Sequence, residues 1–253
     1  MRCLVAPAAF FIALLPLSAT AQQGDDWYIT LAPMYLSAAK TDGHLTAGSK
    51  TVPVFMDFKD TASNLSAAFS VHFEGGKGRW GVASDLNYMG LSTESTFTVL
   101  QATVEGEFDY NQTVFELAGT YRASAKRNFG LIGGLRTFTV GPKVSFTRNQ
   151  TREVIDTSQT SANFFAGFTY RPRLSDKLSL LTRADIGGGD AHMTWSATVG
   201  GEYRFKPWGG VVVAYKGLGI DSGEEATAET IGTGFDMTYY GPTFGLNLHW
   251  GKQ

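Results

Sequence analysis

Residues 64–74 read NLSAAFSVHFE, and their side chains form an apolar series and a polar series that alternate along the chain. The apolar series is Leu65, Ala67, Phe69, Val71 and Phe73, and the other is Ser66, Ala68, Ser70, His72 and Glu74. Successive side chains of a β-strand point to opposite faces, so one face of this strand suits hydrocarbon and the other does not. Because such stretches recur along the chain, the pattern predicts a barrel that crosses a lipid bilayer.

We predict ten strands, with eight or twelve as the alternatives. The predicted strands cover residues 27–37, 64–74, 79–93, 103–123, 129–140, 161–172, 178–188, 195–206, 209–219 and 234–250. Residues 44–56 are a candidate for one more hairpin arm, and residues 129–140 are apolar on both parities. Tyr110 is out of phase with Phe115, which predicts a bulge near Asn111 and Gln112.

The predicted connections alternate between short and long. The short ones are residues 75–78, 124–128, 173–177 and 206–209, and the long ones lie near 38–63, 93–102, 141–160, 188–193 and 220–233. This alternation is typical of outer-membrane barrels, in which periplasmic turns are short and extracellular loops are long. In lipid every backbone polar group must be paired, so the first and last strands must meet. The predicted fold class is therefore all-β, a single closed antiparallel up-and-down transmembrane β-barrel.

The N-terminal residues 1–21 read as a signal peptide, with Arg2 before an apolar stretch and with Ala19 and Ala21 at the cleavage point. Residues 22–253 form the predicted barrel domain, which places the mature protein in the outer membrane. The sole cysteine, Cys3, lies in the leader, so the barrel has no disulfide. The formal net charge is −2 and there is no basic block, which excludes nucleic acid as a partner.

Four stretches carry the resemblance of this chain to known proteins: GRWGVASDLNYMGL (78–91), YRPRLSDKLSLLTRADIGG (170–188), TWSATVGGEYRF (194–205) and GPTFGLNLHW (241–250). With the leader and the amphipathic strands, they resemble the small Gram-negative outer-membrane β-barrel proteins of OmpA-like and OmpW-like style. The resemblance covers nearly the whole mature chain and implies a barrel rather than an activity. Members usually end on an aromatic residue that the insertion machinery recognises, whereas Trp250 is followed here by three more residues.

The inward parity of the predicted strands carries many charges. These residues are His72, Glu74, Arg79, Asp85, Glu116, Arg122, Arg136, Arg171, Arg183, Asp185, Glu202, Arg204 and Lys216. An Arg or Lys that faced lipid at the midplane would cost about 2–4 kcal/mol, which favours the lumen for these side chains. Two interpretations remain open: the charges pair with one another and plug a small barrel, or they line a narrow pore that selects solutes by charge.

Aromatic residues gather beside the short turns, where an interfacial girdle is expected. They are Trp27, Trp80, Tyr121, Tyr170, Tyr203, Phe205, Trp208 and Trp250. Residues 52–64 are more apolar than a solvated loop. They either fold back across the barrel mouth as a constriction, or pack on the outer rim or against a neighbouring loop.

No catalytic or cofactor-binding constellation is evident. The histidines are His44, His72, His192 and His249, and only His192, near Asp190 and Ser196, invites an enzymatic reading. There is no His-x-His, HExxH or cysteine-pair metal motif. We therefore expect no enzyme, no cofactor and no metal. The expected function is structural or surface interaction, and the alternative is a narrow diffusion channel for small solutes. The expected partners are the outer-membrane bilayer and the barrel assembly machinery.

Overall fold

The fold was analysed in a computed structural model of the chain. It describes residues 26–37, 40–47, 50–99, 102–124, 128–148, 151–156, 158–223 and 233–251. The predicted signal peptide, residues 1–21, lies outside the described residues.

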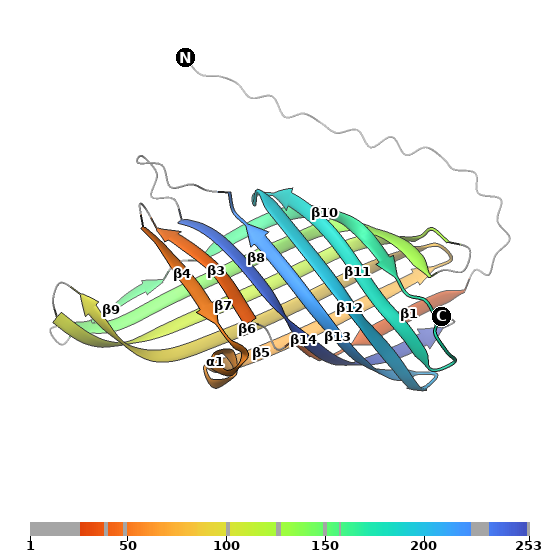
Figure 1. Cartoon of the computed structure of the whole chain (residues 1–253), viewed down its shortest axis with the longest axis horizontal. Coiled ribbons are helices and arrows are strands. Elements are labelled where there is room, and N and C mark those ends of the chain that lie inside the picture. Colours follow the sequence, from red (N-terminus) through yellow and green to blue (C-terminus); the bar gives the residue numbers. More distant parts are fainter. Residues whose placement is uncertain are drawn as a thin grey trace, which may run out of the picture.

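Ten antiparallel strands form one closed wall (Figure 1). In order around the barrel they are β1 (Trp27–Ala32), β5 (Leu65–Lys77), β6 (Trp80–Val99), β7 (Ala102–Arg122), β8 (Phe129–Arg148), β10 (Gln159–Tyr170), β11 (Leu178–Gly189), β12 (Met193–Lys206), β13 (Gly209–Asp221) and β14 (Thr233–Gly251). Neighbours in the wall are neighbours along the chain, as in an up-and-down barrel. The predicted fold class and strand count are confirmed.

The barrel closes where β1 pairs with β14 as well as with β5. Tyr28 lies opposite Gly251 and Leu31 lies opposite Leu248 in this seam. The seam supplies partners for the outer edges of the first and last strands, which is the requirement that hydrocarbon places on a sheet.

The first strand continues along β14 in two further pieces. After Pro33 the chain resumes as β2 (Tyr35–Ser37) and β3 (Lys40–Ala47), both paired with β14. β3 then forms a hairpin with β4 (Lys50–Met56), in which Thr46 lies opposite Thr51. The hairpin arm considered for residues 44–56 is thus present. Residues 52–56 extend the sheet beside β3 instead of crossing the barrel mouth.

A short helix, α1 (Phe58–Ser63), connects β4 to β5. Asp57 caps it, because its carboxylate accepts a hydrogen bond of 2.8 Å from the backbone N–H of Asp60. No helix among the described residues is long and apolar enough to span a membrane.

Two of the predicted long loops are largely strand. β6 and β7 stay paired as far as Val99 and Ala102, and β9 (Thr151–Asp156) pairs with the outer part of β8. The bulge predicted near Asn111 and Gln112 is wrong, because the β6–β7 and β7–β8 registers run through this segment without a shift. Tyr110 instead belongs to the inward parity, where its hydroxyl lies 3.2 Å from that of Tyr239.

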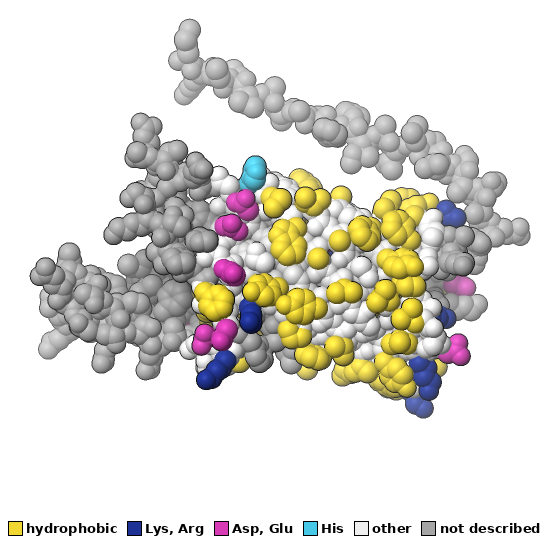
Figure 2. Space-filling model, viewed as in Figure 1, with side chains coloured by type: hydrophobic (Ala, Val, Ile, Leu, Met, Phe, Trp, Pro, Cys, Tyr) yellow, Lys and Arg dark blue, Asp and Glu magenta, His cyan; other side chains and the backbone are white. Residues whose placement is uncertain are grey.

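The outer surface of the wall is apolar. Figure 2 shows hydrophobic side chains along the length of the barrel face, with charged side chains gathered toward its two ends. Exposed members from successive strands include Phe73, Val82, Leu117, Leu131, Phe168, Ile186, Val199, Val213 and Leu246. A soluble monomer rarely exposes so extensive an apolar surface, whereas a transmembrane barrel requires one.

Candidate functional site

The inward residues of the barrel form a layer of paired charges at mid-height. Arg136 of β8 donates to Glu116 Oε1 at 2.8 Å and to Asp185 Oδ1 at 2.7 Å. Arg183 of β11 donates to the second oxygens of the same carboxylates, to Glu116 Oε2 at 2.6 Å and to Asp185 Oδ2 at 2.8 Å. Two arginines and two carboxylates thereby close a ring, in which Arg136 is 0% exposed.

Strand register and one glycine make this ring possible. Glu116 and Arg136 are direct partners between β7 and β8. Asp185 lies one strand further away, beyond β10, where its partner is Gly167. A Cβ at Gly167 would lie 2.5 Å from the Cβ of Asp185, so only glycine fits at this position. The ring of Phe165 lies 4.6 Å from the Arg136 guanidinium carbon and 5.2 Å from that of Arg183, so it contacts both cations.

A second group joins this ring from the side of the first strands. Asp85 Oδ1 accepts hydrogen bonds from the Tyr35 hydroxyl at 3.1 Å and contacts His72 Nδ1 at 3.0 Å. Its other oxygen lies 3.7 Å from Arg183 Nη1. Asp85 therefore connects β2 and β5 to the central ring.

Two further groups lie toward the short turns. Glu74 is paired with Arg171 and accepts a hydrogen bond of 3.3 Å from the Tyr28 hydroxyl. The Arg122 guanidinium stacks 3.7 Å above the Tyr28 ring.

The second of these groups surrounds Glu202, which is hydrogen-bonded to His249 and to Asn247. Arg204 Nε lies 3.8 Å from Glu202 Oε1. The sequence thus located these charges, but their grouping depends on the register.

Arg79 does not join these groups. It precedes β6 in the short turn after Gly78, whose positive φ of 62° reverses the chain. Its side chain is exposed and donates to the Tyr121 hydroxyl at 3.2 Å. Lys216 faces the interior from β13 and lines the cavity described below, and none of the ion pairs among the described residues includes it.

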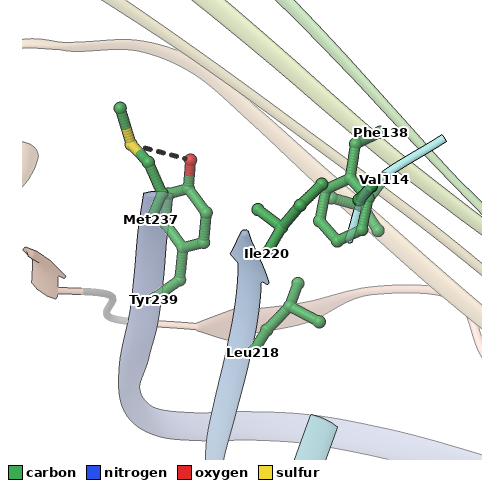
Figure 3. Packing of buried hydrophobic residues seen from close by; sticks show 7 residues of the cluster. Val114, Phe138, Leu218, Ile220, Met237 and Tyr239 are labelled. Atoms are coloured by element: carbon green, nitrogen blue, oxygen red, sulfur yellow. Dashed lines mark hydrogen bonds between the residues drawn. The ribbon is translucent and has the colours of Figure 1, made fainter. Parts of the chain in front are cut away.

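An apolar cluster lies in the barrel interior beyond the charged ring, on the side of the long connections. It consists of Val114, Phe138, Ala191, Leu218, Ile220, Met237 and Tyr239. Figure 3 shows Ile220 directed toward Val114 and Phe138, and the Tyr239 hydroxyl directed at the sulfur of Met237. Sequence analysis missed this cluster. Strand parity could have located it, because Val114, Phe138 and Leu218 each lie two residues from a charged residue assigned to the interior. They therefore lie on the same face of their strands.

A cavity of about 750 Å³ occupies the other half of the interior. Its lining runs from Tyr35, Asp85 and Arg183 to residues of the short turns, such as Asn128 and Arg173. The interior therefore has a hollow half at the short-turn end, a layer of paired charges and an apolar half.

The predicted girdle residues lie on the outside of the barrel near the short turns. Tyr121 is half-buried. The seven exposed members are Trp27, Trp80, Tyr170, Tyr203, Phe205, Trp208 and Trp250. Neighbouring rings touch, with centroid distances of 4.7 Å for Trp80 and Tyr121 and 5.8 Å for Phe205 and Trp208.

The structure does not assemble a triad around His192 within the described residues. The Asp190 carboxylate accepts a hydrogen bond from the backbone N–H of Ala162, and Ser196 is buried in the barrel while His192 is exposed. The side chain of His44 lies outside the described residues. No group of three or more metal-ligating side chains occurs in the described part of the chain.

No protein-family model and no curated protein matches the chain. Among solved structures, it is similar to the translocator domain of the autotransporter NalP from Neisseria meningitidis, with 12% identity, a TM-score of 0.45 and coverage of 90% of this chain and 89% of that one. It is also similar to the outer-membrane protease OmpT from Escherichia coli, with 10% identity, a TM-score of 0.43 and coverage of 92% of this chain and 99% of that one. A third similar structure is the attachment invasion locus protein Ail of Yersinia pestis, with 12% identity, a TM-score of 0.40 and coverage of 90% of this chain and 100% of that one. These similarities are too distant to carry an argument about activity.

Proposed function

We propose that this chain is an integral outer-membrane β-barrel with a blocked interior and a structural or surface-interaction role. The observation that carries the proposal is the stacking of the ring formed by Arg136, Glu116, Asp185 and Arg183 against the apolar cluster. A solute that crossed the barrel would have to separate these buried ion pairs and then pass Phe138 and Ile220. Separating one partner of a buried pair costs about 3–5 kcal/mol, which is a substantial barrier to flux.

The surface for interaction would lie at the end of the long connections. The hairpins β6–β7, β8–β9 and β3–β4 extend the wall at that end, opposite the short turns (Figure 1). Paired strands hold their backbone in place, so they offer a preorganised surface to a partner. In the orientation usual for outer-membrane barrels, this end faces outward.

Export through residues 1–21 and insertion by the barrel assembly machinery complete the proposal. The apolar exterior of the barrel supports the membrane part of it, because such a surface is stable only in lipid. Intact mass measurement of the protein from outer-membrane fractions tests the leader: we expect a mature chain that begins at Gln22.

Single-channel recording in planar bilayers tests the blocked interior. We expect proteoliposomes of the full chain, with insertion verified by protease protection, to give silent bilayers. Steady openings of one defined size would overturn the proposal. The Arg183→Gln variant then identifies the conducting path, because it changes the ion selectivity of a pore through the barrel. Arg79→Gln is the matched control, since Arg79 is exposed at a turn.

The second candidate is a narrow diffusion channel for small solutes. It is favoured by the cavity, which already hollows the barrel from the short turns to Asp85 and Arg183.

We propose that the chain is not an enzyme. Assays of lipid A and peptide turnover by the parent protein and His192→Ala test this, and turnover that depends on His192 would contradict it.

A further inference from the structure

The cavity at the short-turn end carries more cationic than carboxylate side chains. Its cations are Arg122, Arg171, Arg173, Arg183, Arg204 and Lys216, and its carboxylates are Glu74, Asp85 and Glu202. Arg183 is neutralised by Glu116 and Asp185 behind the lining, which leaves five cations for three carboxylates. This imbalance lies inside a wall whose outer face is apolar, where charges are weakly screened.

The carboxylates of the cavity are already occupied by other donors. Glu202 is hydrogen-bonded to His249 and Asn247. Asp85 is hydrogen-bonded to Tyr35 and contacts His72. Little acceptor capacity therefore remains in the cavity for its additional cations.

Two cations of the lining, Arg122 and Lys216, form no ion pair among the described residues. The Arg122 guanidinium lies over the Tyr28 ring and within electrostatic range of Glu74, but Glu74 is already bound by Arg171 and Tyr28. Lys216 lies within electrostatic range of Asp85 and Glu116, but both are bound by arginine or histidine. Both cations are half-buried. A cation held away from bulk water is costly unless an anion compensates it.

We infer that this cavity is a binding site for a soluble oxyanion with two or more negative charges, either a phosphate or a carboxylate compound. The volume of about 750 Å³ is within the usual range for small-molecule sites. The turn residues in the lining place its entrance at the short-turn end. Arg122 ends β7 beside the short turns, and Lys216 lies further along the barrel on β13, within electrostatic range of Asp85. Charge-assisted hydrogen bonds from these two cations hold the anionic groups of the ligand. This inference does not depend on the proposed function.

Isothermal titration of the detergent-solubilised full chain tests the site, with inorganic pyrophosphate and tricarballylate as the two probes. We expect saturable binding of at least one probe. Lys216→Gln and Arg122→Gln should each weaken it by about tenfold or more, since each removes a charge-assisted contact. Lys206→Gln is the matched control, because Lys206 is an exposed cation at the short-turn end of β12 and does not line the cavity.

Arg122→Lys separates a loss of charge from a loss of fold, because it keeps the cation and should retain most of the affinity. The relative affinities of the two probes identify phosphate or carboxylate as the preferred group. Absence of saturable binding by both probes would overturn the inference. An equal loss in Lys206→Gln would do so too, because it would reveal a general surface effect. The binding test does not depend on the single-channel recordings, because the cavity can hold an anion whether or not the barrel conducts.

Discussion

Arg136 decides the charge balance of the barrel interior at the residue scale. It is fully buried and bridges Glu116 and Asp185, which lie on different strands. With Arg183 present, the ring contains two positive and two negative charges, so it is neutral as a unit. Removing Arg136 leaves a net charge where the side chains are fully buried, which is more costly than the ion pair is favourable.

We expect Arg136→Met to lower the free energy of unfolding by about 3–5 kcal/mol, because it leaves one uncompensated carboxylate in the interior. Urea unfolding in lipid vesicles measures the change. The double variant Arg136→Gln with Glu116→Gln restores neutrality and should recover part of the loss. Arg79→Met, at an exposed turn, should change the stability far less. Equal stability of Arg136→Met and the parent would show that the ring is not a stabilising unit.

The sequence locates the members of this ring but not their partners. Parity alone places Glu116, Arg136, Arg183 and Asp185 inside. The contact of Arg136 with Asp185 passes across β10 and depends on the absence of a side chain at Gly167. Such contacts follow from interstrand register and from local space, which a single sequence does not determine.

The alternation of side chains along β13 is the clearest test at the scale of the element. Val212 lines the cavity opposite Glu202, while its neighbour Val213 is 56% exposed on the apolar exterior. We expect Val213→Arg to impair assembly, at a cost of about 2–4 kcal/mol if it lies near the bilayer midplane. Val212→Arg is the matched control and should assemble, because residue 212 faces the cavity instead of lipid and neither of its register partners, Glu202 and Gly245, is a cation. Folded yield in vesicles measures both, and equal yields would mean that the faces are assigned wrongly.

Thr198 illustrates what the structure adds to such a design. Its inward parity predicts that Arg is tolerated there better than at Val199. In the barrel, however, Thr198 is the register partner of Arg183 on one side and of Lys216 on the other. An Arg at Thr198 would meet two like charges, so Val212 is the better inward control.

The cap of α1 makes a second prediction at this scale. Hydrogen bonding from the backbone of Asp60 lowers the pKa of the Asp57 carboxyl below its ordinary value. The cap therefore stabilises α1 above the ordinary pKa and is lost as the pH falls through the lowered one. We expect faster amide hydrogen exchange over residues 58–63 in Asp57→Ala at neutral pH. Asp57→Asn should keep the cap and remove its acid sensitivity, because an amide oxygen accepts the same hydrogen bond and does not titrate.

Outside the membrane the sequence pattern is a weaker guide to strands. Residues 93–102 and 141–160 read as polar loops, but most of them pair in the β6–β7 and β8–β9 hairpins. Alternation marks a strand only where its two faces meet different surroundings. Where both faces meet water, this contrast disappears and the hairpin is read as a loop.

The whole molecule depends on the seam between β1 and β14, which the need to pair every backbone polar group in lipid required in advance. An even number of strands returns the chain to the end where it began, so the two edges can pair. The mid-barrel strand count was therefore accessible from the sequence, while the division of the first strand into β1, β2 and β3 was not. The interruption at Pro33 depends on how the ladder accommodates a residue without a backbone donor.

An engineered disulfide tests the closed seam and its register together. Leu31 and Leu248 lie directly opposite each other, whereas Leu31 and Leu246 are displaced by two residues on the same face. In a Cys3→Ser background, we expect Leu31→Cys with Leu248→Cys to cross-link on mild oxidation, because opposite residues lie within disulfide reach and diagonal ones do not. Non-reducing electrophoresis measures the product. Cross-linking of Leu31→Cys with Leu246→Cys instead would indicate another register, and failure of both pairs would mean that the barrel does not close at β1 and β14.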